Sequence, residues 1–361
     1  MLKVAWGRIL LLGVLLLGLP LAGVVLAGKP VAPYLAFPPR TQYVEHAPFS
    51  WTAFVLLGAL ALAMFVGLVW LLLPRGASST AVRQPRRRPF PWWGWLAVLS
   101  LGSFWWLAWS RYSWFRPFQP YTFTPLWLSY ILLINALTWQ RSGRCLLTHR
   151  RRYFLALFPL SALFWWYFEY LNRFVQNWHY IGIEAFGPLE YALHATFAFS
   201  TVLPAVICTT EWLRTFPALG TRPVSLPWRL PHRRRLAVAM LVACVAGLAG
   251  LGVWPDVLFP LLWVAPLLLI VSLQVLANEP TLFSPLAQGD GRNIALPALA
   301  ALICGFLWEM WNAYSYAKWV YTIPFVDRFH LFEMPLLGYT GYLPFGLECM
   351  AIAGLLDQGR K

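Results

Sequence analysis

The stretch WWYFEYLN at residues 165–172 decides how this chain folds, because GFLWEMWN at residues 305–312 repeats its pattern 140 residues later. Each stretch ends an apolar run with one carboxylate and one carboxamide, three residues apart. A carboxylate inside an apolar helix costs a few kcal/mol. A chain that carries this cost twice, in the same pattern, is predicted to contain a duplicated unit that uses the acid.

The repeat extends well beyond these two stretches. Each copy continues with Trp-x-Tyr, a further Glu and then Leu-Pro, and in both copies 35 residues separate the first Glu from that proline. Each unit is therefore predicted to be a helix, an outer loop rich in Trp and Tyr, and a returning helix. The residues shared after the helix are Trp178, Tyr180 and Glu190 in the first copy and Trp319, Tyr321 and Glu333 in the second.

Composition places the chain in a bilayer. Of its 361 residues 60% are hydrophobic and only 11% are charged, whereas a soluble domain carries about 25% charged residues. The predicted fold is all-α and polytopic, with about ten spans of roughly 20 residues each. The predicted spans are 9–27, 51–73, 91–109, 122–139, 153–171, 188–208, 236–254, 257–277, 294–311 and 336–355.

Three units follow from these spans. Residues 1–73 are predicted to be a two-helix hairpin whose first helix is a retained signal anchor. Residues 91–210 hold helices 3–6 with the first Glu-x-x-Asn copy, and residues 236–361 hold helices 7–10 with the second. Runs rich in Pro and Arg at 74–90 and 211–235 are the predicted linkers. Helices 5–6 and 9–10 then form a parallel internal repeat.

The net charge of +15 does not indicate a nucleic-acid partner, because the cationic residues lie in short runs between apolar segments. With the N-terminus in the cytoplasm, about three-quarters of the Lys and Arg fall on the cytoplasmic side, as the positive-inside rule expects. We therefore predict a multi-pass protein of the inner (cytoplasmic) membrane with both termini in the cytoplasm. Its predicted partners are membrane lipids.

The paired acid and amide are the first candidate catalytic residues. Residues i and i+3 share a helix face, so Glu169 is expected to point with Asn172, and Glu309 with Asn312. Asn can hydrogen-bond either form of a carboxyl group, and an apolar setting disfavours the charged form. A neutral Glu is a suitable proton donor. The alternative is a hydrogen bond between helices that only stabilises the bundle.

Three further acids are candidates. Glu190 and Glu333 lie where the outer loop returns to the membrane and are predicted to orient or relay the proton. The helix dipole alone is an alternative explanation for both of them. Glu348 lies deeper, in the last span, where the first copy has Cys208. An acid present in only one copy suggests that the two halves divide the work.

Aromatic residues are dense, with 22 Trp, 15 Tyr and 25 Phe. Aromatic belts at the membrane interface account for many of them. Those close to the acids could instead line a cavity, because aromatic faces stabilise a cation. Packing against lipid tails is the alternative. The predicted substrate-binding residues are Trp165, Trp166, Trp178, Tyr180, Trp308, Trp319 and Tyr321.

No metal or cofactor is predicted. The six His and five Cys form none of the spaced clusters that bind metals. The sequence also has no Gly-rich phosphate loop, no Ser-His-Asp order and no haem-attachment motif.

Residues 177–191 (NWHYIGIEAFGPLEY) resemble a segment of the small integral-membrane lycopene cyclases, which are built from two homologous halves. The second copy keeps Trp-x-Tyr at 319–321 and LFEMP at 331–335. Where that family has two successive acids, Tyr191 follows Glu190 and Met334 follows Glu333. The resemblance implies a cofactor-free reaction, initiated by an acid, on a long isoprenoid.

Three functions remain open from the sequence. The first is an intramembrane enzyme that uses acid catalysis on an isoprenoid or carotenoid-like lipid, as a cyclase or hydratase does. The second is a proton- or cation-coupled transporter or channel, which also uses repeats and intramembrane acids. The third is a non-catalytic membrane scaffold subunit.

Overall fold

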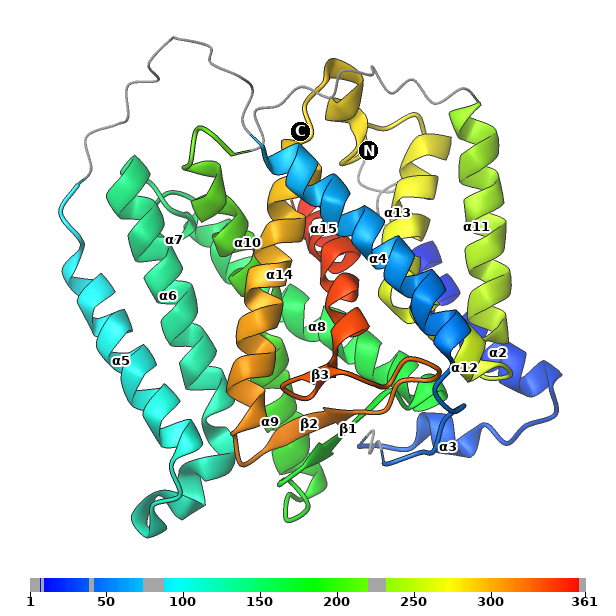
Figure 1. Cartoon of the computed structure of the whole chain (residues 1–361), viewed down its shortest axis with the longest axis horizontal. Coiled ribbons are helices and arrows are strands. Elements are labelled where there is room, and N and C mark those ends of the chain that lie inside the picture. Colours follow the sequence, from blue (N-terminus) through cyan, green and yellow to red (C-terminus); the bar gives the residue numbers. More distant parts are fainter. Residues whose placement is uncertain (1–6, 8–9, 39–41, 74–87, 220–231, 357–361) are drawn as a thin grey trace.

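The computed structural model describes residues 7, 10–38, 42–73, 88–219 and 232–356 (Figure 1). Most of the predicted linker residues, 74–87 and 220–231, lie outside these ranges, as do both ends of the chain. The mainly helical fold predicted from composition is confirmed. The helices are α2 (Leu19–Leu26), α3 (Ala32–Leu35), α4 (Trp51–Leu72), α5 (Trp92–Trp109), α6 (Phe123–Ser142), α7 (Leu146–His149), α8 (Arg151–Val175), α9 (Pro188–Phe199), α10 (Val202–Arg214), α11 (Arg233–Gly250), α12 (Pro255–Leu258), α13 (Ala265–Leu276), α14 (Arg292–Ala313) and α15 (Tyr342–Gly354).

Shorter helical turns link or extend these helices. The π-helical turn η1 (Val14–Gly18) leads into α2, and η2 (Ser113–Tyr121) precedes α6. Two 3-10 turns, η3 (Phe259–Trp263) and η4 (Ser284–Gln288), flank α13, and η5 (Leu336–Gly341) leads into α15. Several predicted apolar segments are therefore bent or broken rather than single straight helices.

Fewer helices qualify as membrane spans than the ten that were predicted. In the described part of the chain, four are long and apolar enough to cross a membrane: Trp51–Leu72, Arg151–Val175, Pro188–Arg214 and Arg292–Ala313. The bent pair η3–α13 would make five. Length explains part of the difference. With 13 residues, α15 rises only about 20 Å, which is short of a hydrocarbon core of about 30 Å.

The two sequence copies fold into corresponding helices. Both α10 and α15 have 13 residues, and each begins one residue before its Leu-Pro pair. Within each copy, α8 packs on α10 and α14 packs on α15, while α10 also contacts α14 and α15. Gly346 permits the close approach of α15 to α14, because a Cβ there would lie 2.1 Å from the Pro297 carbonyl oxygen.

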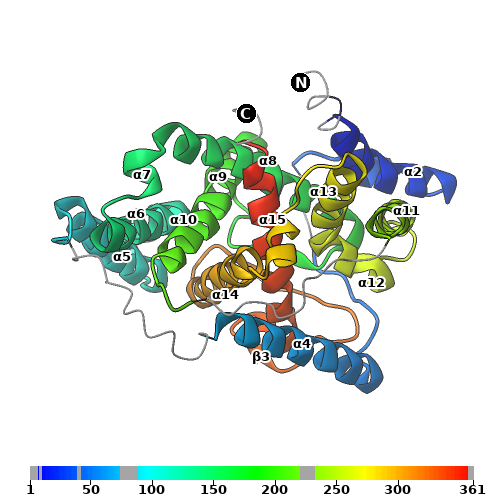
Figure 2. The same ribbon diagram turned by 90° about the horizontal axis from the view of Figure 1, so that it is seen from above.

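Other helices surround this central group. The α5–α6 hairpin lies on one side, and α11, α13 and α2 lie on the other (Figures 1 and 2). Helix α4 crosses the bundle obliquely and contacts α14 and η5. The described residues of all three predicted units contribute to one main hydrophobic core.

The predicted outer loops contain strands that join the copies. β1 (Trp178–Ile181) pairs antiparallel with β2 (Lys318–Tyr321), with Trp178 opposite Tyr321 and Tyr180 opposite Trp319. In this register the two copies are related by a local twofold axis through the pair His179–Val320. A second small ladder joins β3 (His330–Leu331) to β4 (Met334–Pro335). Aromatic and β-branched residues favour strands, but this pairing is made across 140 residues.

Candidate active site

A cavity of about 420 Å³ lies between the β1–β2 sheet and the helices of both copies. Helix α4 closes one side with Leu57, Leu60 and Met64. Its wall is almost wholly apolar or aromatic. Six of the seven aromatic residues predicted to bind substrate line this one cavity: Trp165, Trp178, Tyr180, Trp308, Trp319 and Tyr321.

The seventh residue, Trp166, lies elsewhere. Its indole N–H donates to the Thr196 hydroxyl at 3.0 Å, and its ring packs on Phe199. It is the neighbour of Trp165 on α8, so it points to a different side of that helix. Trp166 therefore does not line this cavity, and substrate binding by it stays a prediction.

Glu169 is fully buried behind the cavity wall. Its Oε1 atom accepts hydrogen bonds from Trp165 Nε1 (3.2 Å), Trp178 Nε1 (3.1 Å) and the Tyr180 hydroxyl (2.6 Å). Its Oε2 atom is buried and has no hydrogen-bond partner among the described residues. All three donors line the cavity.

Glu309 repeats this arrangement in the second copy. Its Oε1 atom accepts from the hydroxyls of Tyr321 (2.9 Å) and Tyr342 (2.6 Å). The Tyr321 oxygen in turn accepts from Trp319 Nε1 at 2.8 Å. Within the described chain, Oε2 of Glu309 again lacks a partner and is buried. Tyr321, Tyr342 and Trp319 line the cavity.

Each carboxyl group therefore lies one side chain away from the cavity. Neither Glu169 nor Glu309 is among the residues that line it. Burial raises the pKa of Tyr180 and of Tyr321 well above the ordinary value, so both phenols stay protonated and donate. The Tyr180 hydroxyl therefore joins Glu169 to the cavity wall, and the Tyr321 and Tyr342 hydroxyls join Glu309 to it.

The two asparagines have a different role from the one predicted. No hydrogen bond between the described residues joins Asn172 to Glu169 or Asn312 to Glu309. Asn172 donates to the Trp178 carbonyl oxygen (2.8 Å) and accepts from the Asn177 N–H (2.8 Å). Asn312 donates to the Trp319 carbonyl oxygen (2.7 Å) and accepts from the Trp319 N–H (2.9 Å). Their amides hold the strands that carry the Trp and Tyr side chains.

Each carboxyl group also accepts from one donor outside its Trp-x-Tyr motif, and this donor comes from a different place in each copy. In the first copy Trp165 supplies it from α8, and in the second Tyr342 supplies it from α15. The counterpart of Trp165 is Gly305, and that of Tyr342 is Val202. A Cβ at Gly305 would lie 2.4 Å from the Tyr342 ring, so this glycine makes room for the phenol. Sequence reasoning missed Tyr342, although an alignment of the copies would have marked this exchange.

Glu190 and Glu333 do not bond to the central carboxyl groups. Glu190 is exposed and accepts a hydrogen bond from Tyr121, which is the main cause of a raised pKa at Tyr121. It lines a separate surface groove with Tyr121 and His194. Glu333 forms an ion pair with Lys318 (2.5 Å). Their predicted role, to orient or relay the proton at the outer mouth, has no direct hydrogen bond between described residues to support it and stays a prediction.

Glu348 is fully buried. Neither of its carboxyl oxygens has a hydrogen-bond partner in the described part of the chain. It lies one helical turn beyond Phe345, whose ring lines the cavity. Glu348 itself is not among the residues that line the cavity.

The described residues contain no group of three or more His, Cys, Asp or Glu side chains placed to hold a metal ion. All five cysteines are buried and free.

Comparisons with protein-family models, with curated proteins and with solved structures find no match for this chain.

Proposed function

We propose that this chain is a multi-pass membrane enzyme that binds a long isoprenoid or carotenoid-like lipid and acts on it by cofactor-free acid catalysis. One observation carries the proposal: two repeat-related, buried carboxyl groups are each hydrogen-bonded by phenols that line a single aromatic cavity. The distant resemblance to the two-halved lycopene cyclases points to the same chemistry.

A membrane setting agrees with the outer surface of the helices. On α4, Val55, Leu56, Leu62 and Val66 are each about 60% exposed. Soluble proteins rarely expose an apolar strip of this length. We infer that the four long helices and the shorter or bent ones together make the polytopic bundle of about ten segments in the inner membrane.

The cavity suits a hydrocarbon better than an ion. Its volume lies in the range of small-molecule sites, and its lining offers rings such as Trp263, Trp308 and Phe345. Aromatic faces stabilise a cation that has no water around it. An isoprenoid double bond that takes up a proton becomes such a cation. An ion-coupled carrier would need a polar path through the same space.

The reaction balances without any co-reactant. The π electron pair of one substrate double bond forms a C–H bond with a proton that originates on a glutamate and passes through a cavity tyrosine. The resulting carbocation is attacked by a second double bond, which forms a C–C bond. Loss of a proton from the cyclic cation to the glutamate then restores a double bond, so the net change is an isomerisation.

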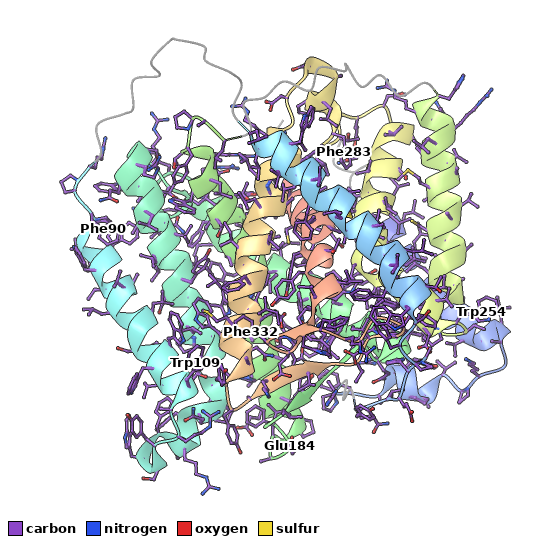
Figure 3. The ribbon with its side chains drawn as sticks, viewed as in Figure 1. Phe90, Trp109, Glu184, Trp254, Phe283 and Phe332 are labelled. Carbon is purple, nitrogen blue, oxygen red and sulfur yellow. The ribbon has the colours of Figure 1, made fainter. Side chains whose placement is uncertain are left out.

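Glu309→Gln is the direct test, because Gln keeps the shape and removes the transferable proton. We expect conversion of an isoprenoid substrate to fall by about 100-fold or more. The measurement is chromatography of lipid products from membranes that contain each variant. Glu184→Gln is the matched control, because Glu184 lies on the loop beyond β1 (Figure 3) and is not among the residues that line the cavity.

Two results would favour the other functions. Undiminished conversion by a correctly folded Glu309→Gln protein would exclude acid catalysis by this residue. Ion flux into vesicles that depends on Glu309 would favour a transporter. Loss of a membrane complex without loss of either activity would favour a scaffold subunit.

A further inference from the structure

We infer that the two carboxyl groups have different tasks: Glu309 holds the proton and delivers it through Tyr342, while Glu169 is an anion that stabilises the substrate cation. This inference rests on the proposed function for the reaction, and on the geometry alone for the two protonation states. It assigns Tyr342 as a catalytic residue that the sequence pattern did not indicate.

The two sites differ in the hydrogen-bond donors that their carboxyl groups accept from. Each site has a Trp-x-Tyr phenol, Tyr180 or Tyr321, so the difference lies in the remaining donors. Glu169 accepts from two indole N–H groups, and an indole N–H can only donate. Hydrogen bonds to the charged form of a carboxyl group favour that form. Three donors on one oxygen therefore stabilise Glu169 as a carboxylate.

Among the described residues, the two hydrogen bonds that meet Glu309 Oε1 at 2.6 and 2.9 Å come from phenols, and a phenol oxygen can accept a proton as well as donate one. The Tyr321 oxygen already accepts from Trp319. Among the hydrogen bonds of the described residues, the Tyr342 hydroxyl donates to Glu309, and none has the Tyr342 oxygen as its acceptor. Tyr342 is therefore the phenol that can take a proton from Glu309 as it gives its own to a molecule in the cavity.

The charged residues near the two carboxyl groups also differ, and they too favour the anion at Glu169. Arg173 lies one helical turn after Glu169 on α8, where residues i and i+4 are neighbours. Its counterpart one turn after Glu309 is Ala313. The second copy does have a cavity-lining cation, Lys318 on β2, but it is ion-paired with Glu333. The first site therefore has a cation one turn after its carboxyl group on the same helix, where the second site has an alanine.

The proton-transfer step follows from this arrangement. The Tyr342 O–H bond breaks as the proton forms a C–H bond with the substrate, and the phenol oxygen takes the proton of Glu309, which becomes a carboxylate. The cation is stabilised by the Glu169 anion behind the aromatic wall. When the cation loses its proton, the same path returns that proton to Glu309.

The first test is kinetic. Tyr342→Phe keeps the ring but removes the hydroxyl, and we expect kcat to fall by about 100-fold or more with KM changed less than about threefold. Trp165→Phe removes the matching donor of the other site, and we expect at most about a tenfold fall, because an anion stabiliser is weakened but the proton path remains. Equal losses in the two variants would overturn the division of tasks.

A second test needs no turnover. Infrared difference spectra of the full chain in nanodiscs at neutral pH, wild type minus variant, report whether each glutamate is protonated. We expect Glu309→Gln to remove a protonated-carboxyl C=O band and Glu169→Gln to remove a carboxylate band. The reverse pattern, or the same band lost in both, would refute the assignment. If the bands follow expectation but no isoprenoid is converted, the proposed function fails while the protonation assignment stands.

Discussion

At the residue scale, the glutamate and the asparagine of each copy have separate roles. Glu169 and Glu309 accept hydrogen bonds from phenols that line the cavity. The asparagines instead fix the backbone that presents the Trp-x-Tyr side chains. An amide suits this role because it donates to one backbone group and accepts from another. A buried backbone group left without its partner costs about 1–3 kcal/mol, so the asparagines support the site indirectly.

Asn312→Ala tests this role. It leaves the Trp319 N–H and carbonyl without their side-chain partner, so we expect the free energy of unfolding to fall by about 1–3 kcal/mol. Thermal unfolding in detergent measures the change. Asn293→Ala is the control, because Asn293 makes one long, exposed contact at 3.4 Å. Equal melting temperatures for the two variants would show that the Asn312 bonds do not support the fold.

At the element scale, helix α9 borders both the central cavity and the surface groove. Its His194 lines both the cavity and the surface groove that contains Glu190. Tyr121 stacks on Phe186, and both rings meet His194 edge-on. This cluster stands between groove and cavity, and the hydrogen bond from Tyr121 to Glu190 ties η2 to α9. A long chain that enters the cavity from the groove must pass His194.

His194→Trp and His194→Ala should therefore have different effects on the binding of long ligands. A larger ring narrows the passage, so we expect binding of the forty-carbon polyene lycopene to weaken by about tenfold, with binding of the twenty-carbon retinol unchanged. His194→Ala should bind both. Energy transfer from the tryptophans of the cavity to the polyene measures binding. A similar loss for both ligands in both variants would indicate structural damage instead of a passage.

At the scale of the whole molecule, two sequence copies build one site. The β1–β2 ladder places the Trp-x-Tyr motif of each copy opposite that of the other, so both carboxyl groups face the same cavity from opposite sides. A single copy would expose the apolar face that the other covers. The twofold relation is approximate, and one departure from it is the exchange of Trp165 and Val202 for Gly305 and Tyr342.

The proposed topology, with the N-terminus in the cytoplasm, gives a prediction for the molecule as a whole. Trp114, which is 66% exposed, precedes α6, and Arg144 follows it, so a span at α6 places them on opposite sides. We expect a membrane-impermeant maleimide to label Trp114→Cys in intact cells and Arg144→Cys only after lysis. The native cysteines are buried and serve as the background. Labelling of both positions in intact cells would contradict the orientation.

The sequence by itself determined the mainly helical fold, the duplication and the identity of both central acids. These features depend on composition and on spacing along the chain, which are local properties. It also marked the Trp-x-Tyr side chains, because they recur at a fixed distance from each glutamate. It overestimated the number of spans, because hydropathy along the chain does not show where a helix bends or stops short.

Only the tertiary structure decided which groups meet. The pairing of β1 with β2, the binding of strand backbone by Asn172 and Asn312, and the approach of Tyr342 to Glu309 all join residues that no local pattern relates. Such contacts depend on how helices pack and on which positions are small enough to let a ring pass, as Gly305 is. The position of Glu190 on a separate groove and of Trp166 outside the cavity follow from the same packing.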